Sequence, residues 1–315
     1  MNKMSSITQR DSFWNRVYEI ARQDRNVILV SADMGAPSLD KFRRNLPSQF
    51  VNAGIAEQNA ILLAVGLAMT GKKVFAYAIA PFITLRCLEQ IRIEVAMMNI
   101  PITIVGVGAG LGYEDSGPTH HLTEDIAVMR AMPNIQIHSI TDSIMASAYA
   151  DISCGLKVPN YIRLERQFAP EIYTKGADFS RGFTVLKKGK DCQIISTGVM
   201  THTALEIAES LKAKKISAGV IDLYSLPINA KDLLPVVKDC RKLITVEEHF
   251  LPGGMGSAVA EFMVDNSVLI PLKRIGFPIE KGYCYKYGGR ENLRKYYGAD
   301  KGGIEQTIIR FVKKG

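Results

Sequence analysis

The stretch that decides the fold is Asn52–Asn59 (NAGIAEQN), which leads into the apolar run over residues 61–69. The apolar run predicts a helix, and Glu57 stands in its first turn, where the helix dipole favours a carboxylate. A glutamate at a helix start is ordinary by itself. The apolar residues behind Glu57 would partly desolvate it, however, which favours the protonated form and suits the group to proton transfer.

On both sides of this segment, short β-branched runs alternate with amphipathic helical stretches, which is typical of an α/β fold with mainly parallel sheets. The periodicity lapses over residues 167–182, which contain Pro170, Gly176 and Gly182, and then restarts. We therefore predict two α/β domains, residues 1–166 and 183–315, joined by a linker over 167–182. The expected elements are helices at 11–24, 57–70, 84–98, 123–132, 204–213 and 230–237, a further helix capped by Thr141 or Asp142, and strands at 27–31, 73–78, 102–107, 135–139, 161–164, 193–196, 217–222 and 243–247.

The composition excludes several classes of protein. The 315 residues are 47% hydrophobic and 22% charged, the balance of a globular enzyme. Lys and Arg outnumber Asp and Glu by 39 to 31, but they are dispersed, so an anionic small molecule or an acidic partner fits the charge at least as well as nucleic acid. Five cysteines without a C-x-x-C pair argue against a disulfide framework and a zinc site. A polar N-terminus and short apolar runs predict a cytoplasmic protein without membrane contact.

A glycine-rich stretch, Gly106–Gly110 (GVGAG), follows a predicted strand and superficially resembles a dinucleotide-binding loop. The remaining glycine of that motif is missing from the required place, and no helix opens directly after it. Because such a motif needs both its spacing and its context, we exclude nucleotide binding here.

Several further segments appear in the order and at the spacings found in transketolases, and together with Gly54–Asn59 they resemble that family over nearly the whole chain. The resemblance covers only the C-terminal half of a full-length enzyme. The matching segments are 31–33 (SAD) with 37–38 (PS), 82–92 (FITLRCLEQIR), 117–120 (GPTH) with 124–125 (ED), 220–223 (VIDL), 246–249 (VEEH) and 253–258 (GGMGSA).

This resemblance implies two doubly wound domains, a thiamine diphosphate pyrimidine-binding domain followed by a transketolase C-terminal domain. It also implies a transferase that moves a two-carbon ketol group from a ketose or its phosphate to an aldose or its phosphate. In the family the chemistry belongs to thiamine diphosphate, while the protein orients it and places protons. The glutamate matching Glu57 would hydrogen-bond N1′ of the aminopyrimidine and so promote removal of the thiazolium C2 proton.

The resemblance also implies a set of site residues. His120 would contact substrate hydroxyls, and Phe82 would stack on the pyrimidine ring, although a plain core role for Phe82 stays open. Arginine forks suit phosphate, although each such arginine could equally be a surface ion-pair residue. The implied residues are, by role, Glu57 and His120 for catalysis, Asp33, Ile55, Glu57, Phe82 and Arg86 for the cofactor, Arg10, Ser38, His120 and Arg166 for the substrate, and none for a metal.

Two departures from the family pattern bear on partners and substrate. No Gly-Asp-Gly segment for the metal and diphosphate occurs, and the family's N-terminal domain is missing. We therefore expect an N-terminal diphosphate-binding partner subunit that holds most of the Mg2+ site, in an α2β2 heterotetramer. The GPTH loop also carries one extra residue before Gly117, and Val107 and Gly108 stand where relatives have a substrate-binding histidine or arginine. The donor pocket is thus expected to accept another sugar.

Three alternatives remain open from the sequence. Arg163 with Arg166 resembles a motif of deoxyxylulose-phosphate synthases, and the β subunits of 2-oxo acid dehydrogenases share the architecture and the glutamate. A non-catalytic scaffold subunit would need neither Glu57 nor His120. A metal site at 247–249 (EEH) is disfavoured, because adjacent strand residues point to opposite faces.

Overall fold

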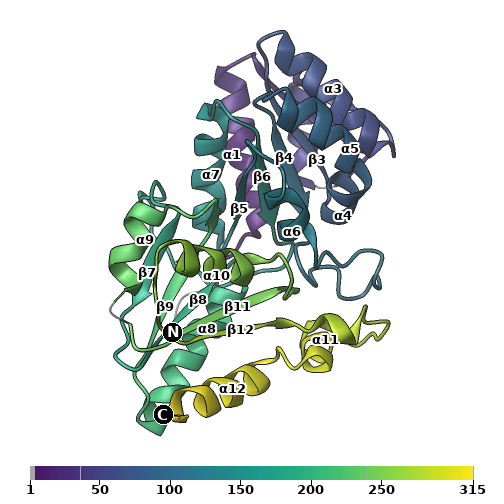
Figure 1. The fold of residues 1–315 in the computed structure, drawn as a ribbon. Helices are drawn as coiled ribbons and strands as arrows, with labels where there is room; N and C mark the ends of the chain where they lie inside the picture. The colour runs from purple at the N-terminus through teal and green to yellow at the C-terminus, as the bar shows by residue number, and fades with distance from the viewer. Residues whose placement is uncertain (1–3, 36, 239, 315) are drawn as a thin grey trace. The chain divides into compact units, whose positions relative to one another are not determined.

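The computed structural model describes residues 4–35, 37–238 and 240–314, which form two compact units (Figure 1). The first unit runs to Gly112 and resumes over Val128–Ala177, and the second comprises Tyr113–Ala127 and the described chain from Asp178 onward. Both units are α/β, which confirms the predicted fold class. The linear division placed residues 113–127 with the first domain, whereas their contacts assign them to the second unit. Within the described ranges, no helix is both long and apolar enough to cross a bilayer.

The first unit is built on a parallel sheet whose own strands run in the order β5-β6-β4-β3-β1-β2. Its inner strands are rich in Val, Ile and Leu and are buried along almost their whole length, as expected where helices cover both faces of a parallel sheet. The strands are β1 (Val27–Ser31), β2 (Phe50–Asn52), β3 (Lys73–Ile79), β4 (Thr103–Val107), β5 (Gln136–Ser139) and β6 (Asn160–Leu164).

Two long helices, α1 and α7, pack side by side against this sheet (Figure 1). Each begins at a side-chain cap: the Thr8 hydroxyl accepts the Asp11 N–H, and the Asp142 carboxylate accepts the Met145 N–H. The Asp142 cap is one of the two that the sequence offered. The helices of this part of the chain are α1 (Gln9–Gln23), α2 (Asp40–Asn45), α3 (Glu57–Met69), α4 (Ala80–Ile83), α5 (Leu88–Gln90), α6 (Asp125–Arg130) and α7 (Ser143–Gly155).

The continuous helix predicted over 84–98 is wrong. The chain forms α4, a 3-10 turn at Leu85–Cys87, α5 and then a π-helical stretch at Ile91–Met97. Thr84 stands at the break, with φ −111° and ψ −78°, and its hydroxyl donates to the Ala80 carbonyl at 2.6 Å. A threonine that bonds the carbonyl four residues back competes with the regular backbone ladder and bends a helix.

The second unit has a sheet in the order β12-β11-β8-β9-β7, parallel except for β7, which pairs antiparallel with β9. Its central strands β8, β9 and β11 are buried throughout. The elements are β7 (Phe183–Lys187), β8 (Cys192–Ser196), α8 (Met200–Ser210), β9 (Ala218–Leu223), β10 (Ser225–Leu226), α9 (Ala230–Val237), β11 (Leu243–Phe250), α10 (Met255–Asp265), β12 (Leu272–Phe277), α11 (Arg290–Tyr297) and α12 (Lys301–Lys313).

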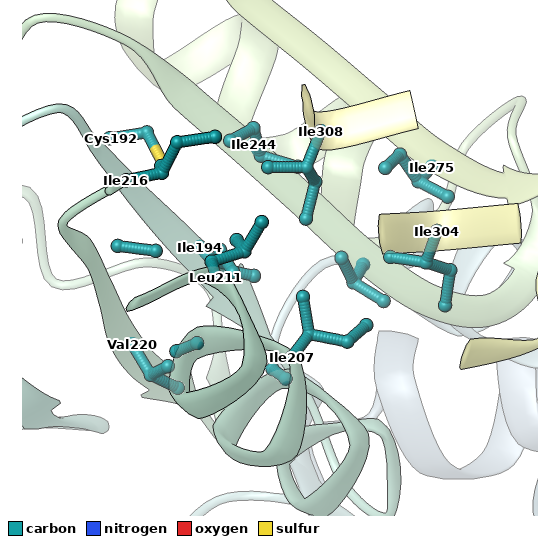
Figure 2. Packing of buried hydrophobic residues seen from close by; sticks show 14 of the residues in the cluster. Cys192, Ile194, Ile207, Leu211, Ile216, Val220, Ile244, Ile275, Ile304 and Ile308 are labelled. Carbon is teal, nitrogen blue, oxygen red and sulfur yellow. The ribbon is translucent and has the colours of Figure 1, made fainter. Parts of the chain in front are cut away.

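The core of this unit lies between the sheet and the helices α8 and α12 (Figure 2). Branched aliphatic side chains dominate it, and their burial supplies the main stabilisation of the unit. The residues at its centre, each 0% exposed, are Ile194 and Ile244 from the strands and Ile207, Ile304 and Ile308 from the helices.

Helix α10 begins at a buried carboxylate. Glu247, on β11, accepts the backbone N–H groups of Met255 (2.6 Å) and Gly256 (2.8 Å). The negative charge at a helix N-terminus satisfies donors that the helix itself leaves unpaired. This close approach depends on glycine, because a Cβ added to Gly254 would lie 2.4 Å from Glu247 Oε2.

We expect Gly254→Ala to destabilise the second unit by about 1–3 kcal/mol, the usual cost of overpacking. The added methyl group would also lie 2.8 Å from His249 Nδ1, so both buried neighbours would have to move. Chemical denaturation followed by circular dichroism measures the change. Gly302→Ala on α12 is the matched control, because a Cβ there meets only Asp300 Oδ2 at 3.4 Å. Equal stability of the two variants would contradict the prediction.

Candidate active site

Glu57 is the first residue of α3 and is only 4% exposed. No side chain caps the helix at Ala56, so the carboxylate of Glu57 supplies the negative charge of the first turn. Arg86 Nη1 donates to Glu57 Oε2 at 2.7 Å. The expectation that the apolar helix removes Glu57 from solvent is confirmed, and the carboxylate has a direct cationic partner.

Arg86 joins Glu57 to Phe82. The guanidinium carbon of Arg86 lies 4.3 Å from the centroid of the Phe82 ring, a cation–π contact. The arginine side chain is 45% exposed, whereas the carboxylate beneath it is buried. Three residues that the sequence assigned to the cofactor are thus brought together, with a planar cation resting on an aromatic ring and bonded to a carboxylate.

Asp33 and Ile55 lie in the turns beside α3, and Asn52 organises them. Asn52 Nδ2 donates to Asp33 Oδ1 (3.0 Å), and Asn52 Oδ1 accepts the N–H groups of Asp33 (3.2 Å) and Gly54 (3.0 Å). Asp33 has φ +53°, and Ile55 is 80% exposed. Sequence reasoning missed Asn52, although an asparagine two residues before a glycine is a common signal of a side chain that closes a turn.

The three residues expected to hold a substrate phosphate gather at the N-terminus of α1. The Arg10 N–H donates to the carbonyl of Glu165 at 3.3 Å, and the Arg166 N–H donates to the carboxylate of the same glutamate at 2.7 Å. Arg166 Nε also donates to the Gly112 carbonyl at 3.0 Å, which ties it to the glycine-rich segment after β4.

Asp11 is the charge partner in this group. Arg10 Nε and Nη2 each donate to the Asp11 carboxylate at 3.1 Å, and the Thr8 hydroxyl donates to it at 2.8 Å. Burial raises the pKa of Asp11, but these bonds, with a smaller contribution from Ser38, outweigh it and hold the pKa below its ordinary value. Ser38 is buried beside the pair, so the structure places all three predicted phosphate residues around one helix start.

His120 belongs to the second unit. Residues Gly117–His120 form a turn in which the His120 N–H donates to the Gly117 carbonyl at 3.0 Å. The Thr119 hydroxyl lies 3.0 Å from His120 Nδ1, which fixes one edge of the half-buried ring. Gly117 has φ +78°, a backbone conformation that favours glycine, and a Cβ there would lie 3.0 Å from the Tyr287 hydroxyl.

His121 is buried, unlike its neighbour, and its Nε2 has no hydrogen-bond partner among the described residues. Burial lowers the pKa of His121, against an opposing effect from the charge of Glu248. The imidazole therefore stays neutral near pH 7. A pair of histidines in a Gly/Pro loop looks alike in sequence, and only the fold separates a half-buried His120 from a buried His121.

The segment 247–249 has three different structural roles. Glu247 caps α10, Glu248 accepts from Arg290 Nε (2.9 Å) and Nη2 (2.7 Å), and His249 Nε2 accepts the Ala127 N–H at 3.3 Å. Glu248 also pairs with Arg294. Loss of one partner from a buried ion pair of this kind costs about 3–5 kcal/mol. Nowhere in the described chain do three or more His, Cys, Asp or Glu side chains gather in a way that could hold a metal ion.

An exposed apolar face surrounds the Glu57 region of the first unit. Helix α3 buries Ile61 and Ala64 against the sheet, yet apolar side chains also cover its outer side. Exposed apolar patches are typical of surfaces that bind another protein, a membrane or a ligand. The exposed side chains are Ile55, Leu62, Leu63 and Met69 around α3, and Leu88, Met97 and Met98 on the neighbouring helical segments.

Two family descriptions match the chain in sequence. The pyrimidine-binding domain of transketolase matches residues 5–171, and the C-terminal domain of transketolase matches residues 183–304. The first alone covers more than half of the chain. Thiamine diphosphate is the cofactor of this family.

Individual relatives match over their whole length. A subunit of the apulose-4-phosphate transketolase of Phocaeicola vulgatus is 35% identical over 98% of both chains, and the putative transketolase C-terminal section of Methanocaldococcus jannaschii is 34% identical over 100% of both. A split-gene transketolase solved as an inactive beta4 tetramer has a TM-score of 0.86 and 31% identity, and it covers 98% of this chain and 99% of that one. The buried Glu57, the GPTH loop and these end-to-end matches agree, and the chain belongs to the transketolase family.

Proposed function

We propose that the chain is the C-terminal subunit of a split transketolase, and that it is active only with an N-terminal, diphosphate-binding subunit. The reaction is the transfer of a two-carbon ketol group from a ketose or ketose phosphate to an aldose or aldose phosphate. The observation that carries the proposal is the buried carboxyl of Glu57 at the start of α3, with Phe82 beside it, in a chain that matches transketolase subunits from end to end.

The residues present fit the aminopyrimidine of thiamine diphosphate. Arg86 now lies on the Phe82 ring and donates to Glu57, so this place accepts a planar group that carries hydrogen-bond donors. An aminopyrimidine ring is likewise planar, and it would share a proton with Glu57 at N1′. When bound, thiamine diphosphate supplies the carbon nucleophile that adds to the donor ketose. For this ring to rest on Phe82, Arg86 has to move from its present position.

The proposed roles of this chain's residues are supported by their surroundings. Glu57 holds or shares a proton at N1′, and its burial keeps water from competing for that proton. His120, with Nδ1 fixed by the Thr119 hydroxyl, presents a polar ring to substrate hydroxyls. Arg10 and Arg166 provide donors for a substrate phosphate, and the phosphate would compete with Asp11 for Arg10.

Three observations support a partner subunit. The described residues offer no ligand cluster for a metal ion, so the Mg2+ and diphosphate of the cofactor need groups from elsewhere. The apolar face around α3 is suited to burial against another chain. The split-gene relative is described as inactive when it is a beta4 tetramer, which supports a requirement for a second kind of chain. We propose an α2β2 heterotetramer in the cytoplasm.

The donor sugar is proposed to differ from the usual pentose phosphates. The extra residue before Gly117 and the small residues Val107 and Gly108 alter the segments that meet the substrate in relatives. The relative from Phocaeicola vulgatus is named for apulose-4-phosphate, which supports the idea that split transketolases act on varied sugars. A deoxyxylulose-phosphate synthase and a 2-oxo acid dehydrogenase β subunit are less well supported, because the relatives that match from end to end are transketolase subunits.

The test is an activity assay of the purified chain with thiamine diphosphate and Mg2+, with and without the candidate N-terminal subunit encoded beside it. Xylulose 5-phosphate with ribose 5-phosphate is tried first, followed by a panel of other ketoses. We expect turnover only when both subunits are present. Activity of either subunit alone, or a complete complex that binds the cofactor but transfers no ketol group from any ketose in the panel, would overturn the proposal.

A further inference from the structure

The loop Tyr113–Ala127, which carries His120, is fixed at both ends by the C-terminal unit. At its far end the Phe250 N–H donates to the Thr123 carbonyl at 2.8 Å, and the Ala127 N–H donates to His249 at 3.3 Å. These bonds connect the loop to the end of β11. The C-terminal unit therefore holds the loop, although in the sequence the loop lies between two segments of the first unit.

Glu114 fixes the near end. Arg290 is the first residue of α11, and its backbone N–H donates to Glu114 Oε2 at 2.7 Å. A carboxylate at this position satisfies a donor that the helix leaves unpaired and is favoured by the helix dipole. Arg290 is itself held by the buried carboxylate of Glu248 through two hydrogen bonds of 2.9 and 2.7 Å. The residue that binds Glu114 is thus itself held in place by a buried ion pair.

Two tyrosines before α11 hold the middle of the loop. The Tyr287 hydroxyl lies 3.0 Å from the position that a Cβ on Gly117 would take, so the turn of residues 117–120 packs closely against this tyrosine. Tyr283 donates to the Glu124 carboxylate, which is the main reason why the pKa of this tyrosine is raised to about 12. His120 lies between these two contacts along the chain.

We propose that the C-terminal unit serves the transfer reaction as a clamp that positions His120, with Glu114 as the principal positioning residue. The clamp consists of Glu248, Tyr283, Tyr287 and Arg290. This inference rests on the proposed function for its catalytic consequence. It assigns a task to the second domain, whose side chains otherwise serve their own packing, and it gives a role to the buried pair of Glu248 with Arg290, whose backbone N–H binds the loop through Glu114.

The first test is amide hydrogen exchange on the isolated chain, which needs no partner and no activity. In Glu114→Ala we expect faster exchange over residues 113–121 and at the Arg290 amide, which loses its acceptor, with the remainder of the second unit unchanged. Glu114→Gln keeps an oxygen for the Arg290 N–H and should restore most of the protection. The control is Glu206→Ala, which removes an exposed pair with Lys301 in the same unit. Unchanged exchange over 113–121 in Glu114→Ala would overturn the clamp.

The second test is kinetic and uses the complex of both subunits. Misplacing His120 should lower kcat/KM for the donor ketose by about 10- to 100-fold in Glu114→Ala, because small errors in position are costly to catalysis. The apparent affinity for thiamine diphosphate and the melting temperature should stay at the wild-type values, which a merely structural defect would not allow. Glu114→Gln should recover most of kcat/KM, and Glu206→Ala should behave as wild type.

A double variant shows whether Glu114 acts through His120. In a His120→Ala background, Glu114→Ala should cost little further activity, since the group that it positions is gone. Full additivity of the two losses would overturn the positioning role. If the wild-type complex transfers no ketol group, the proposed function fails, and the exchange experiment still decides whether the clamp exists.

Discussion

Glu57→Gln is expected to lose about 10²- to 10⁴-fold in kcat, the range that proton placement by a single side chain contributes. Glutamine keeps the size of the side chain but cannot hold the proton that we propose Glu57 shares with N1′. The fold and the assembly should survive, because the partner that loses its counter-charge, Arg86, is 45% exposed and stays solvated. The measurement is steady-state turnover of the complex, with cofactor affinity and melting temperature determined alongside.

Glu89→Gln is the matched control, since Glu89 is an exposed glutamate on the neighbouring helix α5. It should keep wild-type turnover. If Glu57→Gln instead turned over at the rate of Glu89→Gln, Glu57 would have no part in proton transfer, and the central assignment of the site would be lost even if the complex were a transketolase.

The second large effect concerns acid stability and His138. This residue lies on β5, is 5% exposed and packs its ring against Tyr149 with 4.8 Å between centroids. Burial lowers the pKa of His138 from 6.5 to about 3. Below pH 6.5, therefore, His138 takes up a proton in the unfolded chain but stays unprotonated in the folded chain. Stability from this group is complete above pH 6.5 and is lost as the pH falls towards 3, by about 5 kcal/mol in total at about 1.4 kcal/mol per pH unit.

Between pH 6.5 and 4, we expect His138→Phe to reduce the pH dependence of the free energy of unfolding by about 1.4 kcal/mol per pH unit. Urea denaturation at several pH values measures this change. Phenylalanine keeps an aromatic ring against Tyr149 and cannot take up a proton. His202→Phe on α8 is the control, because His202 is half-buried and lies in the other unit. A variant that loses stability with acid as steeply as the wild type would show that another group titrates.

Local patterns were sufficient to predict the Glu57 region. The apolar run after Glu57 specified α3, which begins at the predicted residue, and the short β-branched runs specified strands such as β1 at their observed bounds. Burial of Glu57 followed from the same run. The outer face of α3 did not follow, because an all-apolar helix gives no period that separates buried from exposed sides.

The remainder depended on bonds that a local pattern does not contain. The helix breaks at Thr84 because its hydroxyl donates to the carbonyl four residues back, and helix propensity does not predict this bond. The roles of Glu248 and Arg290 depend on a contact between residues 42 apart, which neither segment indicates by itself. For the same reason, a histidine pair in a loop gave no sign that only one of the two rings is buried.

The clamp on the His120 loop also determines how late in translation the loop can reach its folded position. Glu114 and its anchor Arg290 are 176 residues apart, and a ribosome adds about 5–20 residues each second. Arg290 is therefore synthesised about 9–35 s after Glu114, when all strands of the first sheet have already been made. During translation, the His120 loop is therefore among the last parts of this chain to reach its folded position.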